Sequence, residues 1–158
     1  MVMRAICLAL GVMSAALYGL PAAEAAPALI EGYWRTENGG QVQIRPCGAT
    51  QCGYIAEVAV PRHIYNENKD LIDEVGMQNL PDVFNRDPAL RNRRLLGLKI
   101  FTVTGREPDG RLRGELYNAE DGNTYEGVLT VHNSDKIELS GCVFFNLICR
   151  SEVWRRVR

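Results

Sequence analysis

The stretch Gln41-Val42-Gln43-Ile44-Arg45 alternates polar and apolar side chains, as a β-strand with one buried face does. The stretch Tyr54-Ile55-Ala56-Glu57-Val58-Ala59-Val60 is rich in β-forming residues and ends at Pro61, so it predicts a second strand. Working outward from these two, the sequence predicts six further strands, over residues 33–36, 98–104, 112–117, 125–131, 136–142 and 150–157. Turn-forming residues separate them, at Asn38-Gly39-Gly40, Pro108-Asp109-Gly110, Asp121-Gly122-Asn123 and Asn133-Ser134-Asp135.

Eight short strands joined by tight turns indicate an all-β fold. They favour an antiparallel meander, which can close into an eight-stranded up-and-down barrel and so remove its exposed edges. A β-sandwich is the main competing architecture. If the barrel closes, the strand that contains Trp34 pairs with the strand that contains Trp154.

One long segment interrupts the meander. Residues 61–97, between the third and fourth predicted strands, show little alternation, and we call them the excursion. Residues 69–75 predict a helical turn or two, and Pro81 and Pro88 would interrupt a longer helix. Loops of this length in a compact domain are usually functional, so the excursion is a candidate lid or partner surface. The alternative is a loop that only plugs one end of the barrel.

Length and charge limit the function. A chain of 158 residues with 46% hydrophobic and 23% charged residues predicts one globular domain and excludes global disorder. The formal net charge of -1 argues against nonspecific nucleic-acid binding, which draws its affinity from many phosphate contacts.

The first 25 residues resemble a secretory signal peptide. Arg4 precedes an apolar run from Ala5 to about Leu20, and Ala23-Glu24-Ala25 supplies small residues for cleavage after Ala25. This pattern predicts a mature domain over residues 26–158, free in the periplasm or outside the cell, with no membrane span. A retained membrane anchor is the alternative, but the apolar run is short for spanning a bilayer.

Export changes how the cysteines are interpreted. Cys47, Cys52, Cys142 and Cys149 remain after the signal, an even number that indicates two disulfides in an oxidising compartment. Of the three possible pairings we favour Cys47 with Cys52 and Cys142 with Cys149, because each pair brackets a few residues with turn character. A four-cysteine zinc site is the alternative, and its spacings fit poorly.

Three blocks of sequence follow one another along the chain. They are Asn85-Arg86-Asp87-Pro88-Ala89-Leu90-Arg91-Asn92-Arg93-Arg94-Leu95-Leu96-Gly97-Leu98, then Gly114-Glu115-Leu116-Tyr117-Asn118-Ala119-Glu120-Asp121-Gly122-Asn123-Thr124-Tyr125, then Leu139-Ser140-Gly141-Cys142 with Trp154. The set resembles a bacterial exported family known as domain of unknown function 2147. The resemblance implies a compact barrel related to the calycins and no established reaction.

The tripeptide Gly32-Tyr33-Trp34 resembles the first strand of lipocalins, whose indole closes one end of the barrel beneath an arginine from the last strand. The resemblance implies that Arg155 or Arg156 places its guanidinium over Trp34, a cation–π contact of about 0.5 to 2 kcal/mol. Separately, the turn at Asp121-Gly122-Asn123 requires a positive φ, which Gly122 can adopt.

The search for catalytic residues is mostly negative. No serine of the mature chain lies in a Gly-x-Ser-x-Gly elbow, and His63 and His132 lack metal-ligand spacing, so we assign no catalytic residue, metal or cofactor. A facing carboxylate pair such as Glu115 and Glu126 would suit the acid–base or glycosidic chemistry of a hydrolase. A hydrolase is the third hypothesis for the function, after the two given below.

The most suggestive polar cluster is in the excursion. Guanidinium forks bind carboxylates and phosphates with two hydrogen bonds, so an arginine-bearing lid would select an anionic ligand. The ligand-binding candidates are Asn85, Arg91, Arg93 and Arg94, close to Arg86. The first hypothesis is therefore a periplasmic binding module for a small amphipathic or anionic ligand. The alternative is a structural or protein-interaction domain of the envelope, with a barrel filled by its own side chains.

Overall fold

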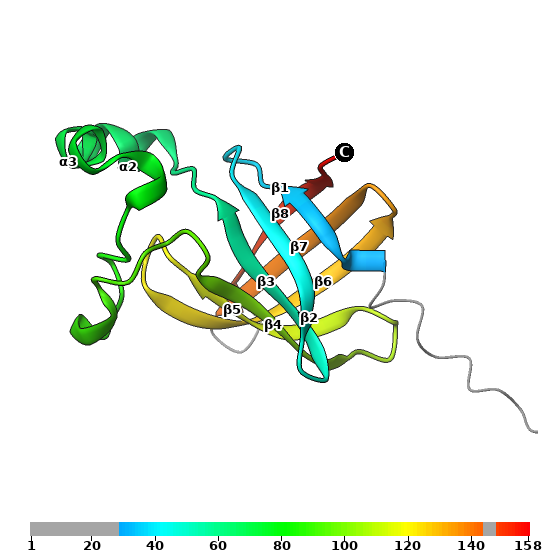
Figure 1. The fold of residues 1–158 in the computed structure, drawn as a ribbon. Helices are drawn as coiled ribbons and strands as arrows, with labels where there is room; N and C mark the ends of the chain where they lie inside the picture. The colour runs from blue at the N-terminus through cyan, green and yellow to red at the C-terminus, as the bar shows by residue number, and fades with distance from the viewer. Residues whose placement is uncertain (1–28, 144–147) are drawn as a thin grey trace, which may run out of the picture.

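The computed structural model describes residues 29–143 and 148–158, and these form a closed barrel of eight antiparallel strands (Figure 1). The strands are β1 Gly32–Arg35, β2 Gln41–Cys47, β3 Thr50–Glu57, β4 Lys99–Arg106, β5 Leu112–Asn118, β6 Asn123–Asn133, β7 Lys136–Val143 and β8 Ile148–Arg156. Each strand pairs with its sequence neighbour, so the predicted all-β meander of eight strands is confirmed and the sandwich is excluded.

Closure joins the two ends of the domain. Figure 1 shows β1 in blue beside β8 in red. In the ladder between them, Trp34 lies opposite Arg156 and Arg35 lies opposite Arg155. The predicted pairing of the Trp34 strand with the Trp154 strand is therefore confirmed. Closure thus pairs the first strand of the barrel with the last, at Trp34–Arg35 and Arg155–Arg156.

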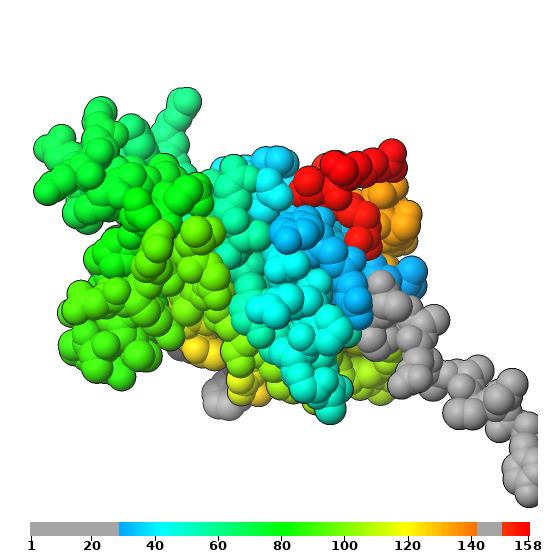
Figure 2. Space-filling view, in the orientation of Figure 1, coloured from blue at the N-terminus to red at the C-terminus, as the bar shows by residue number. Residues whose placement is uncertain are grey.

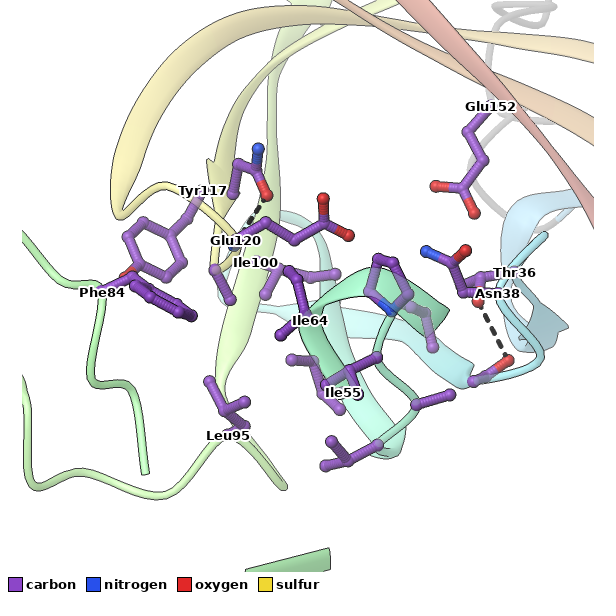
Figure 3. A pocket seen from close by; sticks show the side chains of 18 of the residues that line it. Thr36, Asn38, Ile55, Ile64, Phe84, Leu95, Ile100, Tyr117, Glu120 and Glu152 are labelled. Atoms are coloured by element: carbon purple, nitrogen blue, oxygen red, sulfur yellow. Dashed lines mark hydrogen bonds between the residues drawn. The ribbon is translucent and has the colours of Figure 1, made fainter. Parts of the chain in front are cut away.

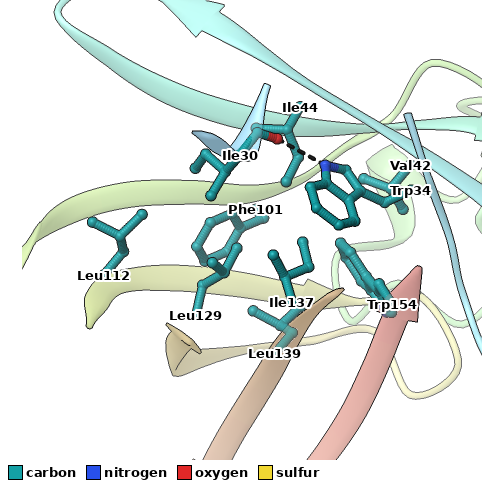
Figure 4. Close-up of a cluster of buried hydrophobic side chains, with 10 residues drawn as sticks. All are labelled: Ile30, Trp34, Val42, Ile44, Phe101, Leu112, Leu129, Ile137, Leu139 and Trp154. Atoms are coloured by element: carbon teal, nitrogen blue, oxygen red, sulfur yellow. Dashed lines mark hydrogen bonds between the residues drawn. The ribbon is translucent and has the colours of Figure 1, made fainter. Parts of the chain in front are cut away.

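Alternation along the strands builds the core at the end of the barrel that Trp34 closes. On β2, Val42 and Ile44 are buried while Gln41 and Gln43 remain half-exposed, as period-2 geometry requires. Figure 4 shows the cluster they join inside the barrel. Its buried members are Ile30, Trp34, Val42, Ile44, Phe101, Leu112, Leu129, Ile137, Leu139 and Trp154.

Trp34 closes this packed end of the barrel. Its indole Nε1 donates to the carbonyl of Ile30 at 2.7 Å, and the guanidinium of Arg156 lies 4.3 Å from the ring centroid. Arg156 also donates through a terminal nitrogen to the carbonyl of Glu31 at 2.6 Å. The lipocalin-like contact expected of Arg155 or Arg156 is thus made by Arg156. Arg155 is the adjacent residue on β8, and because strand side chains alternate, it is exposed on the outer face.

The excursion lies between β3 and β4 and extends from one end of the barrel (Figures 1 and 2). It contains α2 Arg62–Glu67, α3 Lys69–Val75 and the 3₁₀ turns η1 Met77–Asn79 and η2 Pro88–Leu90. The helix predicted over residues 69–75 is confirmed. Helix α2 was not predicted, because it has no side-chain N-cap bond and buries no residue, so its sequence carries neither signal of a helix.

A second, smaller core holds the excursion together. Val58, Ile72 and Leu80 are buried there, and Ile55 of β3 and Leu95 pack against them. The amide of Leu95 donates to the carbonyl of Leu80 at 2.9 Å, which ties the middle of the excursion to its C-terminal end. The excursion is therefore a packed layer beside the barrel end.

Cys47 and Cys52 form the predicted disulfide across the β2–β3 hairpin. The backbone register of β7 and β8 places Cys142 opposite Cys149, but the side chains of these two cysteines lie outside the described residues. The signal peptide predicted over residues 1–25 also lies outside them. Among the helices of the described ranges, none is long and apolar enough to cross a membrane.

Candidate functional site

A cavity of about 730 Å³ lies where the excursion meets the barrel (Figure 3). Its deep walls are apolar side chains of the barrel strands, such as Val42, Leu116, Leu139 and Trp154. Its outer wall comes from the excursion. The main excursion residues there are Ile64, Leu71, Leu80, Val83, Phe84 and Leu95. Since Leu71, Val83 and Phe84 are more than one-third exposed, apolar surface remains accessible at the mouth.

Five carboxylates line this cavity. We call them the acidic rim, and they are Glu37, Glu57, Glu120, Asp121 and Glu152. They come from four separate places, namely the β1–β2 turn, the end of β3, the β5–β6 turn and β8. All five are exposed or half-buried, whereas Val42, Leu139 and Trp154 in the deeper part are buried. The cavity is therefore amphipathic, with charge at the mouth and hydrocarbon below.

Glu120 projects from the β5–β6 turn into the cavity (Figure 3). Desolvation by surrounding protein raises the pKa of its carboxyl group, and the negative charges of Glu152 and Asp121 raise it further. The positive charge of Arg150 and that of His63 when protonated oppose this shift. Among the described residues, no side chain donates a hydrogen bond to its carboxylate.

Two other rim acids fix the position of the β1–β2 turn against β8. Glu37 accepts a hydrogen bond from the amide of Val153 at 2.9 Å, and Glu152 accepts one from the amide of Glu37 at 2.7 Å. These bonds use only one oxygen of each carboxylate. A carboxylate has about four acceptor positions, so both retain capacity for a ligand.

Behind the cavity wall lies a buried polar cluster centred on Asp82. Asp82 accepts hydrogen bonds from Nε of Arg93 at 2.9 Å, from Nδ2 of Asn85 at 2.9 Å and from the hydroxyl of Tyr117 at 2.7 Å. Burial, followed by the hydrogen bond to Asp82, raises the pKa of the Tyr117 phenol, which keeps it a neutral donor. Tyr117 is on β5, so the cluster attaches the excursion to the barrel.

The four ligand-binding candidates predicted from the sequence form bonds within the excursion, and Asn85 also donates to the hydroxyl of Tyr117. Arg93 pairs with Asp82, Arg91 donates through Nε to the carbonyl of Asn85 at 2.8 Å, and Arg94 bonds the carbonyl of Gln78 at 3.3 Å and the side chain of Asn79. Asn85 is buried. None of the four is among the described residues that line the cavity.

The β5–β6 turn packs directly on the excursion. Gly122 has a φ of +70°, as the turn chemistry predicted, and a Cβ at this position would lie 1.9 Å from the carbonyl oxygen of Phe84. Arg86 also donates to Asn123 at 3.2 Å. Two of the three sequence blocks, residues 85–98 and 114–125, therefore contact each other. The first block belongs to the excursion, and the second contains the β5–β6 turn on which the excursion packs.

Glu115 and Glu126 lie opposite each other in the β5–β6 ladder, as an acid–base pair would require. Both are exposed on the outer face of the barrel, and neither is among the cavity-lining residues described. His63 and His132 are exposed as well. Within residues 29–143 and 148–158, no group of three potential metal ligands comes together.

The acidic rim could not be found from a motif. Its members are separated by up to 115 residues, and they lie in turns, at the end of β3 and in the middle of β8. Only barrel closure brings them together.

An antiparallel eight-stranded barrel, closed at one end by a tryptophan beneath an arginine and hollow towards the other, places this chain in the lipocalin-like class of β-barrels. Its sequence matches, over residues 32–156, the family described as "uncharacterized protein conserved in bacteria", domain of unknown function 2147, and the chain belongs to that family.

Among solved structures, the chain is similar to protein HP1028 from the human pathogen Helicobacter pylori, whose title assigns it to the lipocalin family. The two superpose with a TM-score of 0.63 at 18% sequence identity, over 81% of this chain and 82% of the other. At this identity the likeness shows the shared fold. No curated protein matches the sequence.

Proposed function

We propose that this protein is a binding module that holds a small amphipathic ligand in the cavity between the barrel and the excursion. The observation that carries the proposal is the cavity itself, with about 730 Å³ of space, a largely apolar lining and five carboxylates among its polar groups. Small-molecule sites in proteins usually have volumes of about 300 to 1,000 Å³, mostly apolar walls and a few polar groups that orient the ligand.

The distribution of packing supports binding over a purely structural role. At the Trp34 end, ten buried residues fill the barrel, so this end supplies stability. At the other end the strands continue around space that their own side chains leave unfilled. A barrel of eight strands is just wide enough to be either packed or hollow, and this one combines the two states along its axis.

Binding is tested with a variant that fills the cavity. Leu116→Trp adds an indole to the cavity wall, and we expect it to abolish binding of N-phenyl-1-naphthylamine, a neutral apolar fluorophore, measured by its fluorescence on titration. Val128→Trp on β6 is the matched control, since Val128 is not among the described lining residues. Equal fluorophore binding by wild type and Leu116→Trp would contradict a cavity site. Absence of fluorophore binding by the wild type, with no ligand mass retained in native mass spectrometry, would favour the envelope-interaction alternative.

We further propose that the chain is exported and that the domain of residues 26–158 is released by cleavage after Ala25. The signal-like pattern of residues 1–25 and the Cys47–Cys52 disulfide support export, because disulfides persist in oxidising compartments. The intact mass of protein expressed in a bacterium with its native leader should correspond to a chain that begins at Ala26 and lacks four hydrogens. A mass that includes Met1, or four free thiols in non-reducing denaturant, would contradict this proposal.

A further inference from the structure

The charged groups at the cavity are predominantly of one sign. Five carboxylates line it, and Arg150 is the one guanidinium among the described lining residues. With all six groups ionised, the lining carries a formal charge of -4, whereas the whole chain carries -1. The mouth is therefore a local concentration of negative charge on a nearly neutral protein.

These carboxylates have no salt-bridge partner among the residues that the structure describes. None of the five makes a salt bridge with a lysine, arginine or histidine of the described ranges, although six such bridges occur elsewhere there. In the excursion, by contrast, the carboxylate of Asp82 forms a salt bridge with Arg93. Like charges held close together repel one another, so an arrangement of this kind is stabilised when a cation binds.

The carboxylates are also placed to act on one ligand. Figure 3 shows Glu120 and Glu152 reaching the same opening from the β5–β6 turn and from β8. The apolar side chains of Ile64, Ile55 and Ile100 lie beneath them. A ligand whose hydrocarbon part occupies this lower space would have its head group between the two carboxylates.

The indole of Trp154 forms part of the cavity wall. Trp154 lines the cavity and is only 2% exposed, and its indole N–H has no hydrogen-bond acceptor among the described residues. Because this nitrogen is inaccessible to solvent, the indole offers the cavity its apolar surface.

We infer that the cavity selects amphiphiles with a cationic head group, such as an alkylammonium, and rejects their anionic counterparts. This inference rests on the proposed binding function and adds the class of ligand. We therefore infer a cationic ligand where the arginines of the excursion led us to expect an anionic one. Those arginines bond within the excursion, whereas carboxylates line the mouth.

The test compares three ligands with the same ten-carbon chain: decyltrimethylammonium, 1-decanol and decanoate, each below its aggregation concentration, by isothermal titration calorimetry at pH 7. We expect decyltrimethylammonium to bind at least about tenfold more tightly than decanoate, with decanol between them, and the preference to shrink as salt is added. Equal affinities, or tighter binding of decanoate, would overturn the inference while leaving the binding module intact. If none of the three ligands binds, the proposed function itself is wrong and the preference falls with it.

Variants then assign the preference to the rim. Glu120→Gln and Glu152→Gln are nearly isosteric, and the side-chain amide introduced by Glu152→Gln retains a carbonyl oxygen that can accept from the backbone amide of Glu37. Each variant should weaken decyltrimethylammonium binding about twofold to fivefold, as expected for loss of one partly exposed charge, and leave decanol binding unchanged. Glu115→Gln, on the outer face of β5, is the matched control for net charge and should change neither. A preference unaltered in the Glu120→Gln, Glu152→Gln double variant would show that the rim does not select the ligand.

Discussion

Asp82 accepts a hydrogen bond from Nε of Arg93 at 2.9 Å, and the side chain of Asp82 has no solvent exposure although both residues belong to the excursion. Asn85 and Tyr117 complete the set of donors around this carboxylate. Because Tyr117 belongs to β5, this buried charge is one of the contacts that hold the excursion on the barrel. Removing one partner of such a pair is costly, because the remaining charged or polar groups stay buried without their partner.

We therefore expect Asp82→Asn to loosen the excursion selectively. The amide can no longer accept from Arg93, Asn85 and Tyr117 together, so hydrogen exchange at the amide of Leu95, which bonds the carbonyl of Leu80, should become faster by about one to two orders of magnitude. The exposed pair of Asp109 and Arg111 provides the control, and Asp109→Asn should leave that amide unchanged. Equal exchange rates in the two variants would show that Asp82 does not hold the excursion.

Gly122 offers a test of the contact between the β5–β6 turn and the excursion. Gly122→Ala combines the strain of a positive φ with a collision of Cβ against Phe84, and we expect it to lower the free energy of unfolding by at least about 3 kcal/mol. Gly48 has the same φ of +70° and no atom within 4 Å of the added Cβ, so Gly48→Ala should cost about 1 to 2 kcal/mol. Urea unfolding measures both, and equal losses would mean that the contact with Phe84 contributes nothing.

The closed end of the barrel depends on Arg156. Arg156→Ala removes the guanidinium over Trp34 and a hydrogen bond to the carbonyl of Glu31, so it should lower the free energy of unfolding by about 2 kcal/mol. Arg155→Ala, on the exposed face of the same strand, should change it by less than about 0.5 kcal/mol. A larger effect at Arg155 than at Arg156 in thermal or urea unfolding would reverse this assignment.

The raised pKa of Glu120 predicts a pH-dependent effect on stability. The folded state keeps a proton on this carboxyl at higher pH than the unfolded chain does, so the ionised group opposes folding at neutral pH, and the opposition disappears as pH falls through the folded pKa. Desolvation, Glu152 and Asp121 cause the shift, and Arg150 and protonated His63 limit it.

Glu120→Gln should therefore raise the melting temperature at pH 7 by a small amount, on the order of 1 °C, and this gain should vanish below the pKa of the unfolded group. Glu115→Gln serves as the control for loss of one negative charge. The two variants are compared by differential scanning calorimetry between pH 3 and pH 7. If the gain in melting temperature from Glu120→Gln grew as the pH fell, the pKa of Glu120 would not be raised in the folded state.

The strands of this protein are predictable from sequence because their signals are local. Alternation in Gln41-Val42-Gln43-Ile44-Arg45 reports which face is buried, and Asp121-Gly122-Asn123 reports a tight turn, without reference to any distant residue. The same holds for the disulfide, since Cys47 and Cys52 lie on one hairpin. Helix α2 was missed because it buries no residue and has no side-chain N-cap bond, so its sequence has no capping or periodic signal.

The chemistry of the cavity was decided by tertiary structure. Arg93 pairs with the buried carboxylate of Asp82, a partner eleven residues away. The arginine cluster from which we expected an anion site therefore includes a residue that bonds within the protein. Glu37, Glu120 and Glu152 carry no common motif, and barrel closure alone places them around one opening. Sequence by itself determined the number of strands and their order, because these follow from short-range alternation and turns, whereas it left closure into a barrel open against a sandwich. Which charges are neutralised and which face a ligand depends on contacts between distant segments, so only the folded chain decides it.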